Sequence, residues 1–205
     1  WDYINLDTLL SLQHPITSFP DEDIFIIYHQ ITELYFKLSL HEFRQLQLAE
    51  AMDSDVMLKR VKRINRYFEA LTHSFEIMVD GMDKEQFLKF RMSLLPASGF
   101  QSAQYRMIEI QATSFDRLLK DEHRNAHAKH LPGDLIGIFD KIYWKAGAVE
   151  LSSGEKTLTL RQFEEKYDDT LMELAENCFE SNLRSFWKNL GPGQQTDELK
   201  SALRW

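Results

Sequence analysis

Residues 21–50, DEDIFIIYHQITELYFKLSLHEFRQLQLAE, decide the fold class of this chain. Three acidic residues follow Pro20, where a helix N-terminus favours negative charge, and no proline or glycine interrupts the stretch. Its apolar residues recur at helical rather than alternating spacing and form two stripes. The stripes are Ile24, Ile27, Ile31, Leu34 and Leu38, and Phe25, His29, Phe36, Leu40 and Phe43. A helix that is apolar on two faces is expected at the centre of a helical bundle.

The rest of the chain continues this helical pattern. Eight glycines and five prolines in 205 residues leave few turns between long periodic segments. We therefore expect an all-α fold, a helical bundle with long central helices that forms a single domain over residues 1–205. Further helices are predicted at residues 55–80, 83–95, from 100 onward, at 135–144, at 159–190 and, briefly, after Thr196. Residues 121–134 are predicted to be a polar connector, and residues 149–158 a small hairpin or a loop.

Charge and cysteine content exclude several function classes. Lysine and arginine number 24 against 32 aspartate and glutamate residues, a net charge of −8, which argues against a nucleic-acid partner. Cys178 is the only cysteine, so an internal disulfide and a cysteine zinc site are excluded, and a reducing, cytoplasmic location is expected. The longest apolar run, residues 24–28, is far shorter than the roughly 20 residues of a membrane span, so no membrane partner is expected.

Two polar side chains lie on otherwise apolar helix faces. His29 follows Phe25 by four residues, so the two share a face; the imidazole either binds a ligand or is a core histidine satisfied by a neighbouring helix. Arg91 follows Phe87 by four residues and precedes Leu94. Its side chain either lies along the apolar surface with its charge in water, as snorkelling arginines do, or uses its forked guanidinium group to bind a carboxylate.

Other patterns have simpler interpretations. His123, His127 and His130 would share one helix face, but the charged surroundings and Pro132 favour a solvated connector over a metal site. Glu33 and Lys37 have the spacing of a helix-supporting ion pair. Phosphate-binding, metalloprotease and hydrolase motifs do not occur, and no metal ligand is assigned.

Three stretches, in matching order and spacing, resemble the tryptophan 2,3-dioxygenase family. They are YINLDTLL at residues 3–10, FIIYHQITEL at 25–34, and FR at 90–91 followed by LLPASGFQS at 94–102. The resemblance implies an all-α enzyme that uses haem b to insert both atoms of O₂ across the indole C2–C3 bond of L-tryptophan. The product is N-formyl-L-kynurenine, and the family is typically a homotetramer.

The resemblance also implies roles for individual residues. His29 matches the distal histidine that accepts the indole N–H bond, and Arg91 matches the arginine that pairs with the substrate carboxylate. Phe25, Phe87 and Leu94 match walls of the family's indole pocket, and Ser98 and Gly99 match the turn beside the haem. Tyr3 matches a tyrosine that, in the family, reaches into a neighbouring subunit's site. A neutral imidazole and a guanidinium fork suit an indole N–H and a carboxylate, respectively.

Two departures from the family pattern matter. Tyr35 stands where the family often has tryptophan. The proximal iron-ligating histidine and the loop that closes over the substrate have no match, and the helix after Thr196 has barely two turns, so we expect the chain to lack its C-terminal part. Two alternatives stay open: a helical indole- or amino-acid-binding relative without catalysis, and a haem enzyme of the same superfamily with another aromatic substrate.

Overall fold

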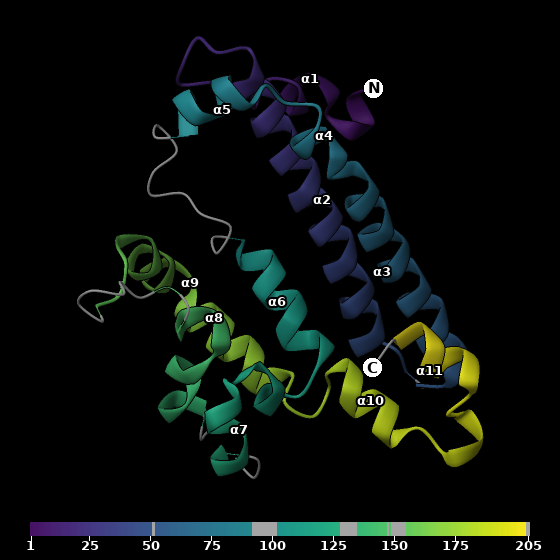
Figure 1. The fold of residues 1–205 in the computed structure, drawn as a ribbon. Coiled ribbons are helices and arrows are strands. Elements are labelled where there is room, and N and C mark those ends of the chain that lie inside the picture. The colour runs from purple at the N-terminus through teal and green to yellow at the C-terminus, as the bar shows by residue number, and fades with distance from the viewer. Residues whose placement is uncertain (51, 92–101, 128–134, 147, 149–154, 204–205) are drawn as a thin grey trace.

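The computed structural model describes residues 1–50, 52–91, 102–127, 135–146, 148 and 155–203, and within these ranges the regular elements are helices (Figure 1). The prediction of an all-α fold is confirmed. The α-helices are α1 (Leu6–Leu9), α2 (Asp21–Gln47), α3 (Ser54–Ser74), α4 (Glu76–Val79), α5 (Lys84–Phe90), α6 (Ala103–Ala112), α7 (Asp121–His127), α8 (Tyr143–Ala146), α9 (Leu158–Asn177), α10 (Leu183–Asn189) and α11 (Asp197–Leu203). Short 3₁₀ helices lie at Asp2–Ile4, Phe115–Leu118, Leu135–Gly137, Phe139–Lys141 and Pro192–Gln194.

Helix α2 is the long helix that its acidic start and apolar spacing predict, and it packs against α3 as an antiparallel pair (Figure 1). Phe36, Phe43 and Leu46 on α2 are buried with Met57 and Val61 on α3. Residues of α6, α10 and α11 complete this hydrophobic cluster. The C-terminal helix thus packs against the same core as the first long helix.

Of the two apolar stripes of α2, only the part of the second that carries Phe36 and Phe43 is buried. Ile27, Ile31, Leu34 and Leu38 are between 40% and 46% exposed. Helix α2 is therefore central through its contacts with α3 and α6 on the side that carries Phe36 and Phe43, while its other apolar face is partly open in the described chain.

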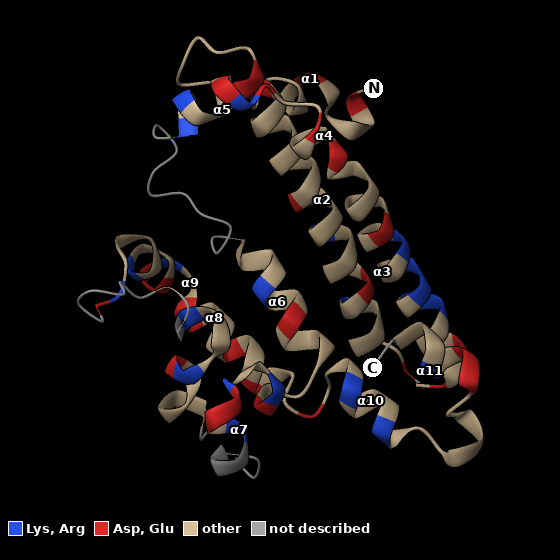
Figure 2. Ribbon diagram, viewed as in Figure 1, with Lys and Arg blue, Asp and Glu red and all other residues tan. Residues whose placement is uncertain are grey.

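A buried carboxylate holds α2 and α3 together. Basic residues gather on α3 (Figure 2), and the Glu42 carboxylate of α2, which is almost inaccessible, accepts hydrogen bonds from Arg60 at 2.9 Å and Arg63 at 3.2 Å. Tyr67 donates a further bond at 3.3 Å. Burial raises the pKa of Glu42, but the bonds and charges of the two arginines outweigh burial and hold that pKa below its usual value.

Helix α6 joins this core to a second hydrophobic cluster. Ile108 faces the α2–α3 cluster, whereas Ala103 and Ile110 pack with residues of α8, α9 and the short helices before them. Trp144 and Phe163 form an edge-to-face pair in the second cluster, with ring centroids 5.5 Å apart. One helix therefore has both of its sides buried against different parts of the chain.

The structure corrects several predicted boundaries. The helix predicted at 55–80 is interrupted at Phe75, where the Ser74 hydroxyl bonds the Leu71 carbonyl. The helix predicted at 159–190 is two helices, because the Asn182 side chain bonds the Cys178 and Phe179 carbonyls and caps α10 by accepting from Ser185 N–H.

Further corrections concern the middle of the chain. The predicted connector at 121–134 contains α7, whose first turn is supported by an Arg124–Asp121 ion pair. Residues 135–144 form two 3₁₀ helices and the start of α8 rather than one helix. Residues 92–101, 128–134 and 149–154 lie outside the described residues, and with them the end of the predicted 83–95 helix and most of the hairpin-or-loop segment at 149–158. The last two residues of that segment are the cap and the first residue of α9.

The predicted helix after Thr196 is confirmed as α11, and the Thr196 hydroxyl accepts a bond from Leu199 N–H at 3.2 Å. None of the helices in the described ranges combines enough length with enough apolar character to span a bilayer.

Candidate functional site

The candidate site lies where α5 meets the first turns of α2. Asp83 caps α5 by accepting a bond from Gln86 N–H at 2.9 Å, which follows from an aspartate directly before a helical stretch. Asp21, the first residue of α2, donates its N–H to the Gln86 side chain at 3.3 Å and accepts a bond from Asp83 N–H. These contacts fix α5 across the start of α2, near the top of Figure 1.

Aromatic rings from both helices meet at this junction. The Phe25 ring centroid on α2 lies 6.2 Å from that of Phe87 and 5.9 Å from that of Phe90, and the two α5 rings are perpendicular at 5.5 Å. Phe90 is fully buried, whereas Phe25 and Phe87 are half-buried. The half-buried rings can therefore contact a bound apolar group, whereas the buried Phe90 ring packs against them from inside and holds them in place.

His29 stands beside this aromatic cluster with a defined hydrogen-bonding state. Its ring lies 4.0 Å from that of Phe25, and Nδ1 is 2.7 Å from the Phe25 carbonyl oxygen. Because a carbonyl oxygen only accepts hydrogen bonds, Nδ1 carries the proton of that bond. In the neutral ring Nε2 is then an acceptor, and the exposed imidazole presents this lone pair to a ligand.

Arg91 follows α5 and is exposed next to the same aromatic cluster. Its guanidinium carbon is 5.9 Å from the Phe87 ring centroid. Among the described residues, no carboxylate lies within ion-pair distance of Arg91. The guanidinium can therefore bind an external carboxylate without first breaking an ion pair in the described part of the chain.

A shallow groove of about 330 Å³ borders His29 on the side of the following helical turn. The surface exposed in the groove is mainly apolar, although five of its eight lining residues carry polar or charged side chains. The lining comprises Leu9, Leu12, His29, Gln30, Glu33, Leu34, Lys37 and Gln104. The N-terminal wall is held in place because Gln30 donates to the Leu12 carbonyl at 3.1 Å and accepts from Gln13 at 2.6 Å.

The structure brings together four of the predicted site residues: Phe25, His29, Phe87 and Arg91. Tyr3 is 97% exposed on the N-terminal 3₁₀ helix and does not line the groove. Leu94, Ser98 and Gly99 lie outside the described residues, as does His130 of the histidine triplet.

The sequence places Phe90 next to Arg91 without indicating a role for it in the site, and sequence reasoning missed the contributions of Glu33 and Gln104. The predicted Glu33–Lys37 ion pair is not formed; the Glu33 carboxylate accepts instead from the Gln104 amide at 2.7 Å. Glu33 lies one turn after His29, and this spacing could have placed it at the site. No local signal points to Gln104, because its partner is 71 residues away.

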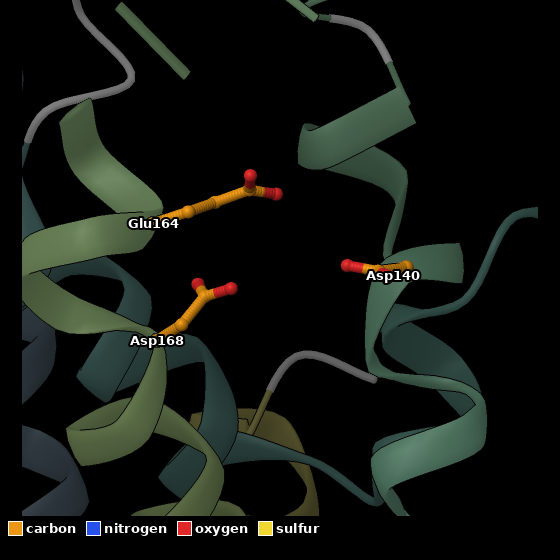
Figure 3. A group of neighbouring side chains, drawn as sticks. All are labelled: Asp140, Glu164 and Asp168. Carbon is orange, nitrogen blue, oxygen red and sulfur yellow. The ribbon is translucent and has the colours of Figure 1, made fainter. Parts of the chain in front are cut away.

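A second polar cluster lies in the other half of the molecule, away from the aromatic junction. Asp140, Glu164 and Asp168 face one another across α9 and the short helix before α8 (Figure 3), with a carboxylate oxygen of each within 4.8 Å of the others. The Lys145 ammonium, almost fully buried, lies 3.1 Å from Asp140 and 3.2 Å from Glu164 and also contacts Asp168. Burial lowers the pKa of Lys145, but the bond to Asp168 and the charges around it raise that pKa overall. Lys156 also lies 2.9 Å from Glu164 and 3.8 Å from Asp140, so two lysine ammonium groups of the described chain supply the positive charge among these carboxylates.

Comparison with known proteins gives one consistent result. A profile of the family described as tryptophan 2,3-dioxygenase matches residues 1–129. A protein of that name from Bradyrhizobium diazoefficiens is 40% identical over 109 residues, 53% of this chain and 39% of the relative. One from a Ruegeria species is 41% identical over the same shares, and one from Polaromonas naphthalenivorans is 29% identical over 99% of this chain and 73% of the relative. The match to the first two of these relatives thus spans about two fifths of their length.

Proposed function

The chain belongs to the tryptophan 2,3-dioxygenase family, and from that premise we propose that it is a haem-dependent dioxygenase of L-tryptophan. In the proposed reaction both atoms of O₂ are inserted across the indole C2–C3 bond, which breaks, and the product is N-formyl-L-kynurenine. The matched family profile, residues 1–129, includes every described residue of the candidate site, of which Gln104 is the last in sequence.

The proposed binding mode uses the four residues that meet at the junction of α2 and α5. The indole ring lies against Phe25 and Phe87, and its N–H donates to His29 Nε2, which is an acceptor because Nδ1 donates to the Phe25 carbonyl. Arg91 binds the substrate carboxylate with two parallel bonds. Two polar contacts at opposite ends of the amino acid fix its orientation, while the apolar contacts bury the indole ring.

The described residues fit the substrate side of a haem pocket. The groove beside His29 is mainly apolar, and the candidate site combines one imidazole with three phenylalanine rings. Bound haem supplies the iron chemistry that activates O₂. By the family resemblance, Ser98 and Gly99 hold the haem, and the chain's own part in the reaction is to bind and orient the indole.

The observation that carries this proposal is the hydrogen bond of His29 Nδ1 to Phe25 within the aromatic cluster. A core histidine would be enclosed, whereas His29 is exposed and borders a groove. A snorkelling Arg91 would extend away from the rings, whereas its guanidinium lies within 5.9 Å of the Phe87 ring centroid. The arrangement therefore favours ligand binding for both side chains.

Absorption spectroscopy and product analysis test the proposal together. The haem-reconstituted, reduced protein should show a Soret band that shifts with CO and is perturbed by L-tryptophan, and should form N-formyl-L-kynurenine in the presence of O₂. Tryptophan binding without a Soret band would instead indicate a relative that binds the amino acid but does not catalyse its oxidation. A Soret band without the product would indicate another aromatic substrate.

We further propose that the chain assembles as a homotetramer in which Tyr3 reaches the site of a neighbouring copy. The almost complete exposure of Tyr3 and the exposed stripe Ile27, Ile31, Leu34 and Leu38 support an assembly. Sedimentation of the protein would give the oligomeric state, and a monomer would contradict the proposal.

Two smaller proposals concern the chain as a whole. Residues 1–205 form one all-α domain, which is supported by the membership of α6 residues in both hydrophobic clusters. A cytoplasmic location is supported by the single cysteine, Cys178, which is buried and unpaired.

A further inference from the structure

Helices α2 and α6 run in the same direction (Figure 1). Two side-chain amide contacts join them, one near each end of α6. At the first contact, Gln104 donates to the Glu33 main-chain oxygen at 3.0 Å and to its carboxylate at 2.7 Å. At the second, Gln47 donates to the Gln111 side chain at 3.2 Å. Fourteen residues of α2 separate Glu33 from Gln47, about 21 Å along the helix axis.

The two contacts differ in their distance from the candidate site. Glu33 lies one turn after His29, and both line the groove together with Gln104. Gln47 and Gln111 lie near Cys178 at the far end of the helix pair. The same pair of helices therefore carries one contact beside His29 and a chemically similar one remote from it.

We propose that Gln104 is a positioning residue, whose bonds to Glu33 hold the start of α6 as a wall of the groove beside His29. This inference rests on the proposed function, because the groove wall that Gln104 holds borders His29, the proposed acceptor of the indole N–H bond. Gln104 is the second residue of α6, immediately after the Ser102 cap, so its bonds act on the first turn of the helix.

The local contacts explain why this role falls to Gln104. The carboxylate accepts one N–H while the main-chain oxygen accepts another, so the amide spans side chain and backbone of a single residue of α2. Bonds to a charged acceptor are stronger and shorter than neutral ones. Without them, the first turn of α6 loses its polar attachment to the His29 face of α2, and the groove wall can move.

The test compares Q104L with Q111L in the haem-reconstituted protein. We expect Q104L to lower kcat/KM for L-tryptophan by about tenfold or more, because a misplacement of about 1 Å at a reacting ring costs up to about 10²-fold. Q111L also removes a contact between α2 and α6, but should leave kcat/KM within about twofold of the unmodified protein. E33Q keeps an acceptor oxygen and should restore most of the activity that E33L loses.

Amide hydrogen exchange gives a readout that does not depend on turnover. Exchange at residues 104–107 should become faster in Q104L and stay unchanged in Q111L. Equal kinetic losses in Q104L and Q111L would overturn the inference and make the Gln104 contact purely structural. An unmodified protein without tryptophan turnover would instead overturn the proposed function, and with it this inference, even if the exchange pattern were as expected.

Discussion

Replacing Arg91 by alanine gives the most direct test of whether the candidate site binds the carboxylate of its ligand. The guanidinium is exposed beside Phe87 and has no ion-pair partner in the described part of the chain, so its removal leaves no buried charge uncompensated. The expected loss is then that of the ligand contact itself, about 1.5–3 kcal/mol for a bond between charged groups. Exposure to water favours the lower end, which corresponds to roughly tenfold weaker L-tryptophan binding.

Two comparisons isolate the carboxylate contact. Tryptamine has the same ring and amine but no carboxylate, so R91A should leave its affinity nearly unchanged. Lys89 lies on the same helix with its ammonium 5.8 Å from the Phe19 ring centroid, and K89A removes an equal charge away from the site. Calorimetric titration of both ligands into R91A, K89A and the unmodified protein measures each effect. If R91A weakened tryptamine as much as tryptophan, or if K89A matched R91A, the assigned role would be wrong.

Three further predictions follow from named contacts. H29A should lower turnover, because the acceptor for the indole N–H is lost, while haem content measured by absorbance stays normal; loss of haem would instead make His29 an iron ligand. E42Q should destabilise the protein by about 1.5–3 kcal/mol in denaturant unfolding, since Arg60 and Arg63 lose their charged acceptor while both stay partly exposed to water. Because the arginines hold the pKa of Glu42 below its ordinary value of 4.5, the stabilisation is complete above pH 4.5 and is lost as the pH falls through the lowered pKa. A difference in unfolding free energy between E42Q and the unmodified protein that did not decrease in acid would contradict the assignment. K145M should lower the melting temperature and make it rise on addition of Ca²⁺, because Asp140, Glu164 and Asp168 lose the one ammonium of the described chain that contacts all three, while Lys156 still pairs with Glu164 and Asp140 only. A Ca²⁺ response of equal size in the unmodified protein would show that Lys145 does not fill that position.

The sequence by itself determined the elements and contacts that depend on near neighbours. Helix α2 could be predicted because acidic residues at its start and apolar residues at helical spacing act within the helix itself. The pairing of His29 with Phe25, and of Arg91 with Phe87, follows from the four-residue spacing that places two side chains on one face. The family resemblance rested on the same local stretches and correctly indicated the family.

Only the tertiary structure decided which contacts form between distant parts of the chain. Helix α2 has two apolar stripes in its sequence, yet the positions of α3 and α6 bury Phe36 and Phe43 of one and leave Ile27 and Leu34 of the other exposed. The bond that gives Glu33 its partner comes from Gln104 rather than from Lys37, because α6 approaches α2 at that turn. Helical periodicity describes one helix at a time, whereas the choice of face, partner and groove depends on how helices far apart in sequence pack together.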